Sequence, residues 1–194
     1  MGFKITQING GMQLNDATNP YDLGEVAVST VSAKHEQFGP FVKTTLTLNN
    51  VAQTVTNGTE YQGTKLYDFA QGRILVLGVT ATLQQKTTSA LASTLNASVT
   101  GAISLGTVTA SNVSLTSTMV DLLPTTAFTS SATINVAGTA VSNALAASAQ
   151  FDGTTTAKDV YLNTAYATTT DVDGNATQTI SGTVVMVWCA LGDY

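Results

Sequence analysis

The stretch ATQTISGTVVMVWCALGDY, residues Ala176–Tyr194, decides the fold class. It begins as an alternating strand and then becomes apolar at odd and even positions alike. Its apolar residues form two sets, one for each face of a strand: Ile180, Val184, Met186 and Trp188, and Val185, Val187, Cys189 and Leu191. A short run that is apolar on both sides is typical of a strand covered on both faces. We therefore expect a central strand of a β-domain, with Trp188 buried beside Cys189 and Gly192-Asp193 ending the strand.

The composition fits one β-domain with a weakly charged surface. The chain has 194 residues, of which 43% are hydrophobic and only 10% are charged. Charged residues usually make up about a quarter of a soluble domain. A polar but uncharged surface suits a protein packed against copies of itself, and we expect such self-contacts through flat, weakly charged strand faces.

Charge and hydropathy exclude several classes of partner. The net charge is −5, and Arg73 is the only arginine, so the clustered basic residues of a nucleic-acid-binding face are missing. The first residues contain no apolar core of a secretory signal. The longest apolar runs, Ile74–Leu77 and Val184–Leu191, are too short to span a bilayer. We expect a soluble protein made in the cytoplasm, with neither a nucleic-acid nor a membrane partner.

Residues 1–25 are expected to form an extended N-terminal arm, followed by a single β-sandwich domain over residues 26–194. Breaks at Gly10-Gly11 and Asn19-Pro20 argue against long regular structure. The alternative is a floppy terminus, but the arm has too many apolar residues for a solvated tail. We expect these residues to contact a neighbouring subunit: Phe3, Ile5, Ile8, Met12, Leu14, Tyr21 and Leu23.

Strand signals recur along the rest of the chain and predict an all-β sandwich. Expected strands are Val26–Ala33, Val42–Leu48, Val51–Thr56, Thr64–Phe69, Arg73–Leu83 and Val160–Ala167. Turns are expected at Asn49-Asn50 and, as type I′, at Asn57-Gly58. Between residues 86 and 150, alternation at Val99, Ile103 and Leu105 and at Val113 and Leu115 favours strands, whereas Val141–Phe151 has the spacing of a short helix.

The sequence contains no recognisable catalytic motif or metal-binding motif. His35 is the only histidine and lies in a polar stretch that we interpret as a solvated loop, and no nucleophile elbow occurs. The spacing Asp171–Asn175 resembles the start of an EF-hand loop. However, Ala176 and Gly182 stand where its glycine and bidentate glutamate belong, and a simple Asp-Gly turn explains the same letters. We predict no catalytic, cofactor-binding or metal-binding residues, and no enzyme.

Four stretches resemble a family of tailed-bacteriophage virion structural proteins: VKTTLTLNN (Val42–Asn50), KLYDFAQGRILVLGVTATLQ (Lys65–Gln84), FDGTTTAKDVYLNTAYA (Phe151–Ala167) and QTISGTVVMVWCALGDY (Gln178–Tyr194). The sequence departs from the family pattern at Ala70, where a proline is frequent. The resemblance implies a head decoration, or cement, protein on the capsid exterior. It also implies a jelly-roll-like antiparallel β-sandwich, homotrimers and the major capsid protein as partner, with no catalytic residues to carry over.

The alternative function is a tail- or fibre-associated module that recognises host surface glycans through aromatic side chains. The tyrosines that would serve it are Tyr21, Tyr61, Tyr161, Tyr166 and Tyr194. Copy number in purified particles separates the two hypotheses, because a head protein is present in hundreds of copies and a tail protein in far fewer.

Overall fold

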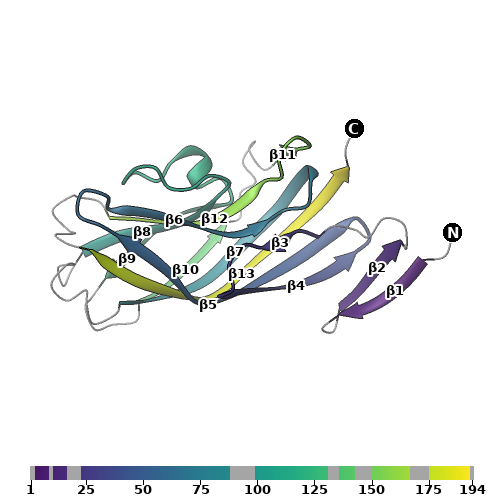
Figure 1. Ribbon diagram of the computed structural model, residues 1–194, viewed down its shortest axis with the longest axis horizontal. Helices are drawn as coiled ribbons and strands as arrows, with labels where there is room; N and C mark the ends of the chain where they lie inside the picture. The colour runs from purple at the N-terminus through teal and green to yellow at the C-terminus, as the bar shows by residue number, and fades with distance from the viewer. Residues whose placement is uncertain are drawn as a thin grey trace.

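The computed structural model describes residues 3–8, 11–16, 23–87, 99–130, 136–142, 150–166 and 175–192. Within these ranges the protein is an antiparallel β-sandwich of two packed sheets (Figure 1). The first sheet has the strand order β10-β7-β13-β5-β4, with β11 also paired to β7, and the second has the order β3-β6-β12-β8-β9. A separate hairpin, β1-β2, precedes both sheets.

The strands of the first sheet are β4 (Val31–Phe38), β5 (Phe41–Val55), β7 (Gly72–Thr87), β10 (Val136–Ser142), β11 (Gln150–Gly153) and β13 (Ala176–Gly192). Those of the second are β3 (Glu25–Val26), β6 (Tyr61–Asp68), β8 (Val99–Gly106), β9 (Leu123–Ser130) and β12 (Asp159–Tyr166). The hairpin consists of β1 (Phe3–Ile8) and β2 (Gly11–Asp16).

The strand order is that of a jelly roll. When β3, β4 and β11 are left out, the first sheet has the order β5-β13-β7-β10 and the second has the order β6-β12-β8-β9. In sequence order these eight strands switch sheet at every step except from β8 to β9, which pair within the second sheet, as in the two Greek keys of a jelly roll. The expected jelly-roll-like, all-β architecture is confirmed.

The predicted central strand is also confirmed. β13 pairs antiparallel with β5 on one side and with β7 on the other along most of its length. Its even-numbered apolar residues face the second sheet, and Ile180, Val184, Met186 and Trp188 have no exposed surface. The structure thus places the last strand of the chain in the middle of the first sheet and its indole in the core.

The other face of β13 differs from the expectation. Val185 and Val187 are only half-buried, and Leu191 is 39% exposed. The second sheet covers the inner face of the first sheet, whereas the described chain leaves this outer face partly open. The prediction that β13 is covered on both faces is therefore wrong for a single copy of the chain.

One predicted turn is a bulge inside a longer strand. β5 continues through Asn49-Asn50, where Asn50 has φ 55°. Its partner β13 shifts register between Ile180 and Gly182, and the Ser181 hydroxyl accepts a hydrogen bond of 2.9 Å from the Asn50 amide. An asparagine in the left-handed backbone conformation occurs in bulges as well as in turns, so the local sequence does not distinguish the two.

The turn at Asn57-Gly58 is present, but its predicted type is wrong. Thr56 and Thr59 form an isolated bridge, and within the turn only Gly58 has a positive φ, of 82°. A type I′ turn needs positive φ at both central residues.

The N-terminal region is more structured than the expected arm. Instead of an extended chain, β1 and β2 form an antiparallel hairpin, and β2 lies beside the edge strand β4. Leu23 is buried in the core, and Glu25 begins β3. The expected strand Val26–Ala33 is divided between β3 in the second sheet and β4 in the first.

The alternation at Val99, Ile103 and Leu105 is confirmed by β8, and the middle of the chain also forms β9 and β10, for which no bounds were predicted. Residues 107–122 form an irregular connection with one 3-10 turn. The expected strand at Val113 and Leu115 is absent there. Asn163 of β12 holds this connection, because its amide donates to the Val108 and Met119 carbonyls and its oxygen accepts from the Ala110 amide. One side chain thus satisfies three backbone groups of the connection, two of them in buried hydrogen bonds.

The expected helix at Val141–Phe151 is replaced at both ends by strand. Val141 lies in β10 and Phe151 in β11. Residues 143–149 between them lie outside the described part of the chain.

Candidate functional site

An apolar cluster crosses the outer face of the first sheet near the turn between β4 and β5. Register aligns Phe38, Phe41, Cys189 and Leu75 in one row across four strands, and Val187 lies on the same face, one pair further along β13. Phe38 is 63% exposed and Phe41 43% exposed, Leu75 and Val187 are half-buried, and Cys189 is buried. We call these five residues the outer patch. Exposed apolar side chains that adjoin one another are typical of interaction surfaces.

The turn itself explains why two phenylalanines lie together. Phe38 and Phe41 flank Gly39-Pro40 and pair directly. Gly39 has φ 61°, the conformation that the first residue of a type II′ turn requires. The Phe-Gly-Pro-Phe sequence therefore carries a signal for this pair that strand periodicity alone missed.

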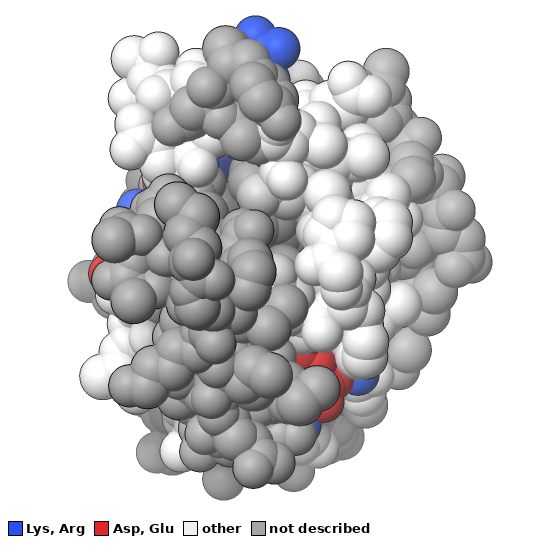
Figure 2. Space-filling view, turned by 90° about the vertical axis from the view of Figure 1, so that its right-hand side faces the viewer, with Lys and Arg blue, Asp and Glu red and all other residues white. Residues whose placement is uncertain are grey.

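One cluster of charges borders the outer patch. Lys34 and Lys43 contact the two carboxylate oxygens of Glu36 at 2.9 and 3.0 Å. Hydrogen bonds from Lys34 and Lys43 lower the pKa of Glu36 to about 2. Seen from the hairpin end, the described surface is otherwise mostly uncharged (Figure 2). The rim thus carries a small excess of positive charge beside an apolar centre.

The N-terminal hairpin has an apolar face of its own. Its register pairs Ile5 with Leu14 and Gln7 with Met12. Because alternate residues of a strand share a face, Phe3, Ile5, Met12 and Leu14 fall on the same face of the hairpin. Four of the seven predicted interface residues are therefore together.

The other three predicted interface residues are elsewhere. Ile8 lies opposite Gly11 on the second face of the hairpin. Tyr21 is outside the described residues. Leu23 is 9% exposed and packs in the sandwich core, so its side chain is already covered by its own chain.

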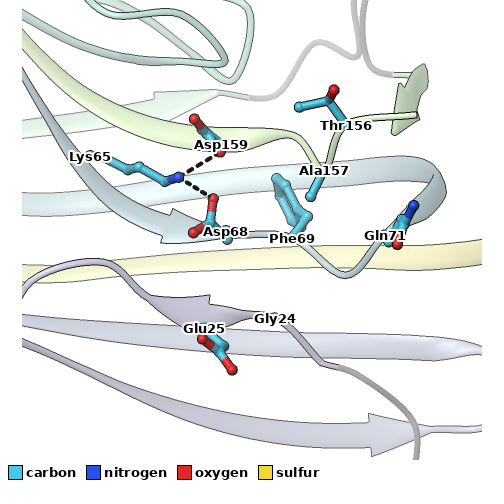
Figure 3. Close-up of a pocket in the computed structure, with 9 residues that line it drawn as sticks. All are labelled: Gly24, Glu25, Lys65, Asp68, Phe69, Gln71, Thr156, Ala157 and Asp159. Atoms are coloured by element: carbon cyan, nitrogen blue, oxygen red, sulfur yellow. Dashed lines mark ion pairs between the residues drawn. The ribbon is translucent and has the colours of Figure 1, made fainter. Parts of the chain in front are cut away.

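A pocket of about 430 Å³ lies on the opposite side of the sandwich, between β3, β6 and the start of β12 (Figure 3). Lys65 lies between two carboxylates, at 2.5 Å from Asp68 and 3.0 Å from Asp159. The Tyr161 hydroxyl donates to Asp159 at 2.9 Å. Asp159 pairs with Asp68 across the strands, so the cluster joins β6 to β12.

Burial and the Asp159 hydrogen bond raise the pKa of Asp68, against the effect of Lys65. Burial acts to raise the pKa of Asp159 too, but hydrogen bonds from Asp68, Lys65 and Tyr161 outweigh it and leave that pKa below its usual value. Carboxylates in direct hydrogen-bond contact leave no space for the sugar ring that a glycosidase pair flanks. Phe69 is 1% exposed and offers no stacking surface. The cluster is best described as an ion-pair network that holds two strands together.

His35 is not in a loop, which corrects our interpretation of the sequence. It lies in β4 and faces inward, with Nδ1 at 3.0 Å from Oγ1 of Thr44 and its ring 5.9 Å from that of Tyr67. Burial lowers the pKa of His35. A hydroxyl beside a histidine is the pairing a nucleophile needs. Thr44, however, has no exposed surface, so no substrate reaches its oxygen in this structure.

The remaining candidates are placed as follows. Cys189 is a free thiol, 6% exposed, as its assignment to an apolar strand predicted. Of the tyrosines considered for glycan binding, Tyr166 has no exposed surface, Tyr61 and Tyr161 are half-buried, and the other two lie outside the described residues. The turn Asp171–Asn175 is described only at Asn175.

Among the described residues, no three side chains of the metal-ligating types lie close enough to hold an ion. In the same part of the chain, no helix has the length and apolar character to cross a membrane. No protein-family model, curated protein or solved structure matches the chain.

Proposed function

We propose that this protein is a structural component of a bacteriophage particle that decorates the head through subunit contacts and performs no catalysis. In this proposal the protein is a homotrimer on the capsid exterior, and its partners are its own copies and the major capsid protein. The observation that carries the proposal is the outer patch, an apolar surface on a sandwich with few charged residues.

Three features support the proposal together. The four stretches quoted above resemble virion structural proteins, and they correspond to strands β5, β6-β7, β11-β12 and β13. Jelly rolls are common in viral capsid proteins, although lectins share them, so topology alone does not choose a function. The outer patch supplies an exposed apolar surface suited to contacts between proteins.

Copy number tests the proposal. Purified particles would be separated by gel electrophoresis, and this chain quantified against the major capsid protein by mass spectrometry with isotope-labelled peptides. We expect hundreds of copies per particle and binding of the purified protein to heads that lack it. A few copies, or tens, would instead indicate the tail- or fibre-associated module, and absence from particles would overturn both.

The glycan-binding alternative has one structural feature in its favour, the pocket of Figure 3. Carboxylates and the Gln71 amide are groups that bind sugar hydroxyls. Both carboxylates are already paired with Lys65, however, and the only aromatic residue lining the pocket, Phe69, is buried. Glycan binding that survives Asp159→Asn and Gln71→Ala would exclude this pocket as the site.

A further inference from the structure

We propose that the apolar face of the β1-β2 hairpin of one copy packs on the outer patch of a second copy. Both surfaces belong to this chain, and the outer patch keeps two exposed phenylalanines, Phe38 and Phe41. The inference concerns which surfaces join the copies, and it holds or fails independently of where the protein resides in a particle.

The first argument is the sequence of β13. Val185, Val187 and Cys189 make its outer face apolar, although the second sheet reaches only the inner face. With the whole chain present, hairpin included, Phe38 remains 63% exposed and Phe41 43% exposed. The hairpin of the same copy therefore does not cover the patch in this structure. A strand that is apolar on both sides is typical of one that is buried on both sides.

The second argument is the hairpin. Two-stranded sheets are marginal in water unless one face packs against something. Register gives this hairpin one face with Phe3, Ile5, Met12 and Leu14, and a second with Lys4, Thr6, Gln13 and Asn15 among its residues. Its neighbour in the fold is the edge strand β4, alongside which β2 lies (Figure 1). If its apolar face packed on the face of a sheet, the apolar surfaces of the hairpin and of the sheet would both be buried.

The third argument is charge. Asp16 pairs with Phe3 and so lies at one end of the apolar face. The rim of the outer patch carries Lys34 and Lys43 around the single carboxylate of Glu36, a net positive charge. A hairpin face with one acidic end complements a patch with a basic rim, and complementary rims fix the orientation of a contact.

Symmetry follows from this choice of occupant. A patch that meets the same patch on a second copy gives a two-fold dimer and leaves the hairpins unused. A hairpin that meets a patch joins two different surfaces, so the contact is either exchanged reciprocally between two copies or repeated head to tail around a closed ring. In a trimer of the second kind, each copy would donate one hairpin and accept another, so every outer patch would be covered.

The test is complementation between point variants of the full chain. Ile5→Asp with Leu14→Asp disables the hairpin face, with Thr6→Asp and Gln13→Asp on its opposite face as the control. Phe41→Asp disables the patch, with Thr47→Asp as the control, because Thr47 is exposed on the same sheet face beyond the patch. Light scattering gives the assembly state at equal concentration, and thermal melting confirms that each variant is folded.

We expect the full chain and both controls to assemble, and each disabled variant to lose at least tenfold in self-association. A mixture of the two disabled variants keeps one intact hairpin and one intact patch, so it should form a dimer that does not grow. A hairpin variant that assembles like the full chain would overturn the proposal, as would a full chain that is monomeric.

Cross-linking separates packing between copies from packing within one copy. In a Cys189→Ala background, Leu14→Cys protein is mixed with Phe41→Cys protein and oxidised. A disulfide between the two chains is expected, and neither protein alone should form one. Disulfides between two Phe41→Cys chains would indicate patch-to-patch dimers. A bond formed only within a chain carrying both substitutions would show that the hairpin covers its own patch. Either result overturns the proposal.

Discussion

The indole Nε1–H of Trp188 donates a hydrogen bond to Oγ1 of Thr44 at 2.9 Å, inside the core of the sandwich. The same Thr44 oxygen lies 3.0 Å from Nδ1 of His35, and a hydroxyl that accepts the indole proton can still share a second hydrogen bond with the imidazole. The chain of contacts joins β13, β5 and β4 across the inner face of the first sheet. One threonine thus satisfies the indole of the central strand and orients the only histidine.

Replacing Thr44 with valine should therefore destabilise the protein by about 1–3 kcal/mol, because the buried indole N–H loses its acceptor. Thr45→Val is the matched control, since Thr45 is the next residue but lies half-buried on the outer face. Urea unfolding at pH 7 measures both. Equal stability of the two variants would show that the Trp188 bond contributes nothing net.

Trp188 is the only tryptophan and has no exposed surface, so it reports on the core. Trp188→Ala should lower the free energy of unfolding by roughly 3–5 kcal/mol, because it leaves a large cavity beside Phe69. The native emission maximum should be blue-shifted and move to longer wavelength on unfolding. Native emission that is already red-shifted and readily quenched by iodide would contradict this placement.

The lowered pKa of His35 predicts a loss of stability on mild acidification. Burial favours the neutral imidazole in the folded state, so the unfolded chain binds more protons as the pH falls below about 6.5. The contribution is complete above that pH and is lost as the pH falls through the folded-state pKa. His35→Gln, which keeps a polar side chain, should remove this part of the pH dependence.

The comparison requires urea unfolding of both proteins between pH 7.5 and 5. Carboxylates with raised pKa values, Asp68 and Asp121, act in the opposite direction and are common to the two proteins. Parallel stability curves for the two proteins would contradict the assignment to His35.

Removing Lys65, the lysine of the ion-pair network, should destabilise the protein more at neutral pH than at acidic pH. In Lys65→Met, Asp68 and Asp159 keep their contact without a counter-charge, so we expect a loss of about 1 kcal/mol or less at pH 7. Such a pair binds a shared proton more readily folded than unfolded, so the deficit against the unmodified chain should shrink between pH 7 and pH 4. Lys34→Met is the control, because Glu36 retains Lys43. A deficit that grows on acidification would contradict this account.

The sequence predicted the sandwich and its central strand because the alternation of apolar residues is visible locally. Strand pairing then keeps each set of alternating residues on one face of the sheet. The prediction failed for His35 because Lys34–Gln37 is polar at every position, and the inward set of β4 (Val31, Ala33, His35 and Gln37) is too polar to show alternation. Polar residues are tolerated there because β4 is an edge strand, where burial is incomplete.

The outer patch was only half visible in the sequence. The alternation around Val187 and Cys189 indicated that the outer face of β13 is apolar. The other members of the patch, Phe38, Phe41 and Leu75, come from three other strands. Their alignment depends on register, which non-local pairing fixes. The same limitation hid the contact between Asp68 and Asp159, which are far apart in the chain and opposite each other in the sheet.

The position of β13 also has a consequence for the order in which the protein folds. β5 and β7 do not pair with each other. Both pair with β13, which follows every other described strand in the chain. During synthesis, β5 and β7 therefore expose unpaired edges until β13 has been made and inserts between them. Unpaired strand edges in an incomplete sheet are prone to association with other chains, so the synthesis of β13 is the step that removes this exposure.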